Sequence, residues 1–118
     1  MYKIEKTDDF DKWLRKLKDF RAKAKILFRI QKIENDEHFV DCEPDVNRIR
    51  ELKIDYAKGY RVYFKESDGK IIILLIGGDK STQQRDIEKA KEILKRIKIV
   101  WKWKLQNLIY QTIWIVTK

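Results

Sequence analysis

The apolar residues in the first third of the chain change from an alternating to a helical spacing. Residues 2–6 alternate and predict a strand. Two stripes of apolar residues three and four positions apart then predict two helices. Thr7, Asp8 and Asp9 are candidate N-caps of the first helix, and Asp19 is the candidate N-cap of the second. The stripes are Phe10, Trp13, Leu14 and Leu17 in the first helix, and Ile26, Leu27, Ile30 and Ile33 in the second. Their short connection predicts an antiparallel helical hairpin.

Strand signals follow the hairpin. The acidic segment 34–45 predicts a loop. Residues 49–54 and 60–65 alternate in most positions and predict two strands, and the apolar run 71–76 predicts a third strand that is buried on both faces. Ser67-Asp68-Gly69 predicts the turn between the last two strands, because Asp-Gly is a strong hairpin signal.

A third helix is predicted after a pair of glycines. Gly77-Gly78 ends the apolar strand, and Ser81 with Gln84 has the spacing of a capping box. The helix that follows has an apolar stripe of Ile87, Ala90, Leu94 and Ile97. The order of elements predicts an α+β fold with an N-terminal strand, an α-helical hairpin, a three-stranded antiparallel sheet and a C-terminal helix.

The end of the chain differs from the rest. With 118 residues the chain fits one domain, which we assign to residues 1–98. Residues 99–118 form an apolar extension with three of the four tryptophans. We expect this extension to be an added strand or a docking arm, through which the chain could contact a partner or a second copy of itself. Its apolar part is too short and too interrupted to span a membrane.

The charge of the chain narrows the class of partner. Lys and Arg total 28 against 19 acidic residues, which gives a net charge of +9. The excess is concentrated in residues 11–32, where nine basic residues face two acidic ones. Such a balance favours a polyanionic partner, because neutralising phosphates releases counterions. The alternative is a lysine-rich surface that serves only solubility.

Several classes of site are excluded by composition. One cysteine, Cys42, allows no internal disulfide framework and indicates a reducing compartment. With one histidine, His38, the chain is a poor candidate for a structural zinc site. The charged start of the chain has no apolar run typical of a signal peptide. We therefore expect a cytoplasmic protein that uses neither metal nor cofactor.

Basic residues on the predicted strands suggest a site for phosphate chemistry. Lys53 and Arg61 lie on the polar faces of their strands, and pairing of the two strands brings them together. Lys80 follows the end of the next strand and can reach the same region. Such cations can stabilise a pentavalent phosphorane, and RNA supplies its own nucleophile in the 2′-hydroxyl. Lys53 would accept the 2′-hydroxyl proton or act only as a charge. The alternative interpretation of Arg61 is a strand arginine that is exposed to solvent and has no functional role.

Three stretches of the chain resemble a known family. They are residues 51–64, which end in Gly-Tyr-Arg-Val-Tyr-Phe, residues 75–83, which contain Gly-Gly-Asp-Lys-Ser-Thr-Gln, and residues 10–14 followed by 22–26. In this order they resemble the RelE/ParE superfamily of bacterial toxins, most closely its HigB-like subgroup of addiction-module killer proteins. The resemblance covers residues 4–97 and implies a RelE/ParE-like fold.

The resemblance also implies an activity. RelE-like members are metal-independent endoribonucleases of type II toxin–antitoxin systems, which cleave mRNA in the ribosomal A site and so inhibit translation. The catalytic positions would be Arg61, Lys53 and Lys80, although the family usually has arginine where this chain has Lys53. The turn at residues 56–59 lacks one glycine and the proline of the family pattern. For contact with RNA and the ribosome we expect a set of one aromatic and four basic residues: Tyr63, Lys58, Arg21, Lys25 and Arg29.

The expected partners follow from this assignment. They are a cognate antitoxin with a helix-turn-helix, the ribosome and mRNA, and no membrane. One alternative is a ParE-like toxin that inhibits DNA gyrase without nuclease activity. Another alternative is an inactive toxin relic or a binding module. The cluster of Lys53, Arg61 and Lys80 argues against the gyrase inhibitor, because binding gyrase requires no cations on the sheet.

Overall fold

A computed structural model describes residues 2–36, 42–44, 49–67 and 71–97. Its strands are β1 (Lys3–Lys6), β2 (Cys42–Pro44), β3 (Arg50–Ile54), β4 (Tyr60–Ser67) and β5 (Ile71–Asp79). Its helices are α1 (Asp8–Lys16), α2 (Phe20–Asp36), one turn of 3₁₀ helix at Lys80–Thr82, and a helix over residues 83–97. The predicted α+β fold and its order of elements are confirmed. The extension at 99–118 and the turn at 68–70 lie outside the described residues.

The strands form one mixed sheet in the order β1-β5-β4-β3-β2. The predicted antiparallel core of β3, β4 and β5 is present, and the N-terminal strand adds to it parallel to β5. The prediction of a loop over 34–45 was wrong at both ends, because α2 continues to Asp36 and residues 42–44 pair with β3. The backbone groups at this edge of β3 gain hydrogen-bond partners by that pairing, whatever the charge of the side chains.

The N-caps of the helical hairpin are Asp19, as predicted, and Thr7, one of three predicted candidates; Asp8 and Asp9 lie inside α1. The Thr7 side chain accepts a hydrogen bond from Phe10 N at 3.0 Å, and its hydroxyl donates to the Leu75 carbonyl on β5 at 2.7 Å. Asp19 Oδ1 accepts from the backbone N–H groups of Arg21 and Ala22 at 3.0 and 3.1 Å. Thr7 therefore ties the start of α1 to the sheet, where β1 ends.

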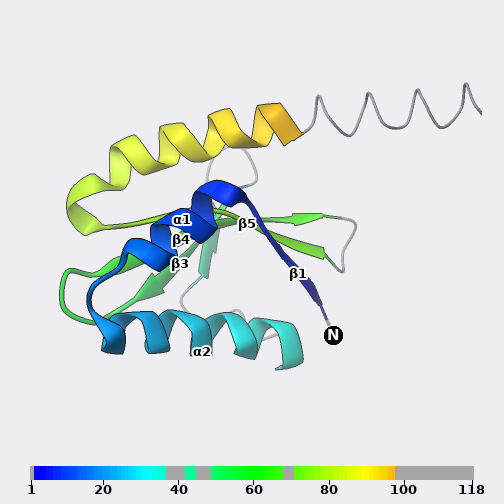
Figure 1. Ribbon diagram of the computed structural model, residues 1–118. Helices are drawn as coiled ribbons and strands as arrows, with labels where there is room; N and C mark the ends of the chain where they lie inside the picture. The colour runs from blue at the N-terminus through cyan, green and yellow to red at the C-terminus, as the bar shows by residue number, and fades with distance from the viewer. Residues whose placement is uncertain (1, 37–41, 45–48, 68–70, 98–118) are drawn as a thin grey trace, which may run out of the picture.

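Helices cover both faces of the sheet. Figure 1 shows α2 on one side of the sheet and the 83–97 helix on the other, with α1 beside β5. One core lies between the sheet and the hairpin, and its fully buried members include Ala22, Ile26, Leu52, Val62 and Phe64. The second core lies under the 83–97 helix and includes Ile49, Tyr63, Leu75, Ala90 and Leu94. Trp13 packs against both cores from α1.

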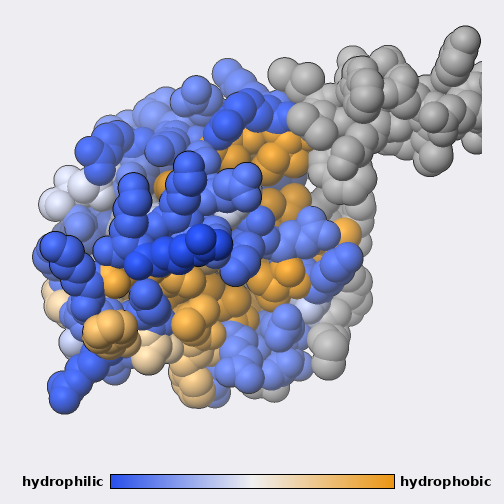
Figure 2. Space-filling model, in the orientation of Figure 1, coloured by the Kyte–Doolittle hydropathy of each residue, from blue (hydrophilic) through white to orange (hydrophobic). Residues whose placement is uncertain are grey.

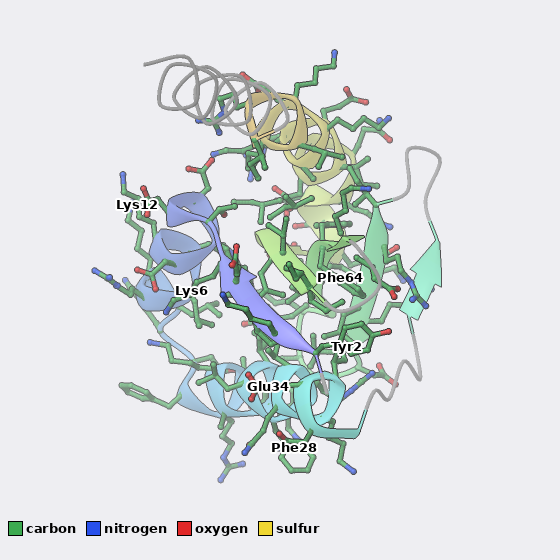
Figure 3. The ribbon with its side chains drawn as sticks, turned by 90° about the vertical axis from the view of Figure 1, so that its right-hand side faces the viewer. Tyr2, Lys6, Lys12, Phe28, Glu34 and Phe64 are labelled. Carbon is green, nitrogen blue, oxygen red and sulfur yellow. The ribbon has the colours of Figure 1, made fainter. Side chains whose placement is uncertain are left out.

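The predicted stripe of α2 needs one correction. Ala22, Ile26, Ile30 and Ile33 face the core, whereas Leu27 is 48% exposed. The one-position difference from Ile26 turns a helical side chain by about 100°, which places Leu27 on the outer surface. The opposite end of the helix is tied down at the Glu34 carbonyl, which accepts from Tyr2 N at 3.1 Å. Figure 3 shows Tyr2 and Glu34 close to each other at this end.

The glycine pair lies within β5 rather than after it. A Cβ built on Gly77 would lie 2.2 Å from the Trp13 ring, and one built on Gly78 would lie 1.7 Å from Asp86 Oδ2. The two glycines therefore let α1 and the 83–97 helix approach the strand closely. The predicted capping box at Ser81 was wrong, because Asp79 is the N-cap and forms the box with Thr82. Within the described residues, no helix is both long and apolar enough to cross a membrane.

Candidate functional site

The strands bring two predicted catalytic residues directly opposite each other. Lys53 on β3 is the cross-strand partner of Arg61 on β4, and Arg61 in turn pairs with Gly78 on β5. Directly opposite residues of paired strands point to the same face of a sheet. Lys53 and Arg61 therefore share the face on which the 83–97 helix lies, and Gly78 adds no side chain between Arg61 and that helix.

The turn between β3 and β4 brings in Lys58 and Lys80. Gly59 has φ of 70°, and a Cβ there would lie 3.5 Å from Lys80 Cβ and 3.7 Å from Arg61 Nη1. Lys80 N also donates to the Lys58 carbonyl at 3.4 Å. A hollow of about 410 Å³ lies here, lined by Lys58, Asp79, Lys80 and Ser81. The structure thus gathers all three predicted catalytic residues and Lys58 at one end of the sheet.

Ala57 explains one difference from the family pattern of this turn. Its φ of 51° lies in the left-handed region, which glycine adopts without steric cost. The turn therefore keeps the conformation for which a glycine is suited, although the chain has alanine there. The position of Lys58 between two such residues depends on this conformation.

Arg61 is held by a carboxylate that the sequence analysis did not single out. Glu51 Oε1 lies 2.8 Å from Arg61 Nε, and both side chains are mostly buried, with 10% and 13% exposed. Arg61 Nη1 donates to the carbonyls of Gly59 and Tyr60 at 3.3 and 3.4 Å. Among the described residues, Nη2 has no hydrogen-bond partner, so this nitrogen is available to a phosphate oxygen.

Glu51 also connects the site to the 83–97 helix. Gln83, at the start of that helix, donates from Nε2 to Glu51 Oε1 at 3.1 Å. Glu51 could have been found from the sequence, because it lies two residues before Lys53 and therefore on the same face of the strand. The face that carries Lys53 and Arg61 is covered in part, because the 83–97 helix packs over Tyr63 and Leu75.

Tyr63 cannot take the stacking role that we expected. Its side chain is fully buried beneath the 83–97 helix, with an exposed fraction of 0%. The alternation of β4 does place it on the Arg61 face, but that face is covered at this position. A base cannot reach a ring enclosed by its own core, so another aromatic residue must supply stacking if RNA is bound.

The basic residues of α2 lie on the other face of the sheet, next to the same turn. Arg21 and Lys25 are exposed, and the Lys25 ammonium lies 5.2 Å from the centre of the Tyr56 ring. Arg29 is half-buried and donates from Nη1 to the Lys53 carbonyl at 3.1 Å, which joins α2 to β3. Figure 1 shows the start of α2, the β3–β4 turn and the start of the 83–97 helix at the same end of the molecule.

Two titratable groups near the site have shifted pKa values. Burial, followed by the nearby charges of Asp19 and Asp79, raises the pKa of Tyr60, so its hydroxyl stays protonated at neutral pH. Hydrogen bonds from Ser81 lower the pKa of Asp79 below its ordinary value of 3.8. Asp79 is therefore a carboxylate beside Lys58 and Lys80 at neutral pH. Within the described residues, no group of three His, Cys, Asp or Glu side chains could hold a metal ion.

The solved structures that this chain resembles include a bacterial toxin and two toxin–antitoxin complexes. A mutant of the E. coli toxin RelE in the free state superposes with a TM-score of 0.58 at 18% identity, covering 81% of this chain and 97% of that one. The E. coli RelBE toxin–antitoxin complex gives 0.56 at 15% identity, over 67% and 96% of the chains. RelBE2 from Mycobacterium tuberculosis gives 0.54 at 16%, over 67% and 98%. The expected RelE-type fold is confirmed, and the HigB-like subgroup stays a prediction.

Sequence comparison gives the family. An uncharacterized protein of Haemophilus influenzae is 48% identical over 94 residues, which cover 80% of this chain and 94% of that protein. Residues 12–98, most of the chain, match the family described as "Phage derived protein Gp49-like (DUF891)". The chain therefore belongs to the phage-derived Gp49-like family.

Proposed function

We propose that this protein is the toxin of a toxin–antitoxin pair and that it cleaves mRNA on the ribosome. The observation that carries the proposal is the direct pairing of Lys53 with Arg61, with Lys80 at the end of the neighbouring strand. These three cations lie on a fold that the chain shares with RelE toxins. A cluster of cations on that fold is suited to a polyanionic substrate.

The cations would act on a single phosphodiester. The 2′-oxygen of the ribose attacks the adjacent phosphorus, its bond to phosphorus forms, and the bond from phosphorus to the 5′-oxygen breaks. The 2′-hydroxyl gives up its proton and the 5′-oxygen takes one, so the products are a 2′,3′-cyclic phosphate and a 5′-hydroxyl. Arg61 stabilises the charge on the phosphorane through Nη2, while Lys53 and Lys80 act beside it as acceptor of the 2′-proton or as charges.

The buried pair with Glu51 supports this role for Arg61. An ion pair at Nε and two hydrogen bonds from Nη1 to backbone carbonyls restrict the guanidinium before substrate binds. Stabilisation of a transition state is most effective when the charged group is already in position. Glu51 cancels the charge of Arg61, but Lys53, Lys58 and Lys80 keep the site positively charged.

The partners follow from the same proposal. Two of the structures that share the fold are toxin–antitoxin complexes, which supports a cognate antitoxin that would bind this chain and block the site. We expect that antitoxin to carry a helix-turn-helix. Because ribosomes and mRNA are cytoplasmic, the protein would act in the cytoplasm. On the ribosome, Arg21, Lys25 and Lys58 would contact RNA phosphates around the end of the molecule where the turn lies.

Toeprinting on translating ribosomes tests the proposal. We expect the purified protein to produce new mRNA ends in the A-site codon, and Arg61→Ala to abolish them. Arg15→Ala is the matched control, because Arg15 is 77% exposed on α1 and its ion pair with Asp11 lies away from the site. Thermal unfolding of each variant confirms that the comparison is made between folded proteins.

Two outcomes would overturn the proposal. If the unaltered protein produces no cleavage on ribosomes, it is not a ribosome-dependent nuclease, and a supercoiling assay then tests the ParE-like alternative of gyrase inhibition. If Arg61→Ala cleaves as well as Arg15→Ala, then cleavage does not depend on the cation cluster.

A further inference from the structure

The outer face of α2 carries exposed aromatic residues that the proposed cleavage does not use. Phe20 is 79% exposed and Phe28 is 57% exposed, in a helix whose inner stripe fills the core. Figure 3 shows Phe28 projecting from α2 on the side away from the sheet. In Figure 2, apolar side chains reach the surface along the lower edge of the molecule, over α2, between hydrophilic ones. Exposed aromatic residues in such a setting mark an interaction surface.

A groove adjoins Phe28 where α2 meets the end of β3. It has a volume of about 530 Å³, and α2 contributes Lys25, Phe28 and Arg29 to its walls. Ile54, Asp55 and Tyr56 contribute the opposite wall. This volume lies within the range of about 300–1,000 Å³ that is typical of small-ligand sites. The lining holds two aromatic rings and two cations against one carboxylate, that of Asp55, and this net positive lining is suited to a ligand with a planar ring and a negative charge.

The charge around the groove selects the class of ligand. The α2 residues from 20 to 33 carry five cations and no acidic residue: Arg21, Lys23, Lys25, Arg29 and Lys32. Ammonium groups already lie over the aromatic faces, Lys32 at 5.4 Å from the centre of the Phe28 ring and Lys25 at 5.2 Å from that of Tyr56. Phe28 stays more than half exposed in spite of Lys32, so a base can still reach its ring.

We propose that this groove binds single-stranded RNA, with one base stacked on Phe28 beside Tyr56 and the flanking phosphates on Lys25 and Arg21. Aromatic stacking combined with a cationic rim is the usual way in which proteins hold single strands without reading sequence. The inference rests on the proposed function for the class of ligand and replaces the stacking role of the buried Tyr63. The groove borders the turn that carries Lys58, so an RNA strand in it can continue to the cation cluster on the other face.

Fluorescence anisotropy of a labelled 12-nucleotide oligouridine RNA with the full chain tests the groove. We expect saturable binding, and Phe28→Ala should weaken it by about five-fold or more, the usual loss for one stacked base. Phe20→Ala is the matched control, because Phe20 is an exposed phenylalanine of the same helix that does not line the groove. Its affinity should stay within two-fold of the unaltered protein, by the same measurement.

A second pair of variants tests the phosphate contact. Lys25→Ala should lower the slope of log affinity against log salt by about 0.7, the change for one phosphate contact with a single strand. Lys23→Ala is its control, because Lys23 lies over the Phe20 ring, outside the groove. Poly-L-glutamate should compete less well than unlabelled oligouridine at equal charge, because it has no bases to stack.

The inference is overturned if the unaltered protein shows no saturable binding, or if Phe28→Ala and Phe20→Ala bind equally. It is also overturned if poly-L-glutamate competes as well as RNA, which would indicate an acidic protein as the occupant. The toeprinting assay separates this result from the proposed function. If the unaltered protein cleaves mRNA and Phe28→Ala binds oligouridine as tightly as it does, only the groove proposal is overturned. If the unaltered protein binds oligouridine through Phe28 but cleaves no mRNA, only the nuclease proposal is overturned.

Discussion

The pair of Glu51 and Arg61 allows a quantitative test of how the site is held. Glu51→Ala removes the carboxylate from Arg61 Nε and from Gln83 Nε2, at 2.8 and 3.1 Å. Arg61 then keeps only its two contacts to backbone carbonyls while remaining 13% exposed. The perturbation therefore leaves a mostly buried guanidinium without its counter-charge.

The expected cost follows from that burial. Breaking a buried ion pair by removing one partner costs about 3–5 kcal/mol, because the remaining charge is uncompensated. Arg61 keeps two carbonyl acceptors and some contact with solvent, so we expect Glu51→Ala to lower the free energy of unfolding by less, about 2–3 kcal/mol. A chain of 118 residues has an unfolding entropy near 0.25 kcal/mol/K, so Tm should fall by about 8–12 °C. Glu51→Gln keeps a hydrogen-bond acceptor and should cost about half as much.

A double-mutant cycle separates the pair from the rest of the site. Thermal and urea unfolding of Glu51→Ala, Arg61→Ala and the double variant give the coupling energy. We expect the double variant to be more stable than the sum of the single changes implies, by about 1–2 kcal/mol, because each single change leaves an unpaired charge. Additive costs within about 0.5 kcal/mol would refute the claim that the two side chains form an energetically coupled pair.

Three further changes test other parts of the structure. Gly77→Ala should lower stability by about 1–3 kcal/mol in urea unfolding, because the new Cβ would lie 2.2 Å from the Trp13 ring; an unchanged midpoint would contradict that packing. Ala57→Gly should raise stability by about 0.5–1 kcal/mol, since the residue has φ of 51°, and a loss of stability would show that the turn does not need this conformation. Asp79→Ala should cost about 1 kcal/mol at pH 6 through the lost cap. Because hydrogen bonds from Ser81 depress the pKa of Asp79 below 3.8, the ionised side chain stabilises the folded state above that pH and ceases to do so as the pH falls through the folded value. The difference in Tm between the two proteins should therefore shrink at pH 2.5, and an equal difference at both pH values would contradict the assigned cause.

Signals within a few residues in the sequence, such as N-caps and apolar stripes, correctly identified the helices. Thr7 and Asp19 cap the helices that they precede, because a side-chain oxygen next to free N–H groups needs no distant contact. In the 83–97 helix, Ala90 and Leu94 of the predicted stripe are buried and Ile87 and Ile97 are partly buried, but Ile93, which was not predicted, is buried as well. The prediction failed at Leu27, where a run of apolar residues is wider than the face that the sheet can cover.

The cations of the site were predictable from the sequence, and so was the face on which the carboxylate of Glu51 lies, but the role of that carboxylate and the burial of Tyr63 were not. Lys53 and Arg61 lie in the stretch 51–64 that resembles the toxin family. The alternation of their strands places them on a shared face once the strand register is known. Glu51 lies on that same face, but its role depends on Gln83 from an element 32 positions further along the chain. The exclusion of Tyr63 depends on the 83–97 helix, which covers one part of the face and not the other.

The sequence by itself determined the type and order of the main elements, the caps of the hairpin and the identity of the basic residues. Those properties depend on hydrophobic period and on chemistry within a few residues. The tertiary structure alone decided that Lys58 joins the three predicted cations and that Glu51 pairs with Arg61. It also decided that Phe28 and Tyr56 line an open groove whereas Tyr63 is buried. Strand register and helix packing set these relations, because they bring together residues that the chain keeps far apart and decide which side of each residue meets water.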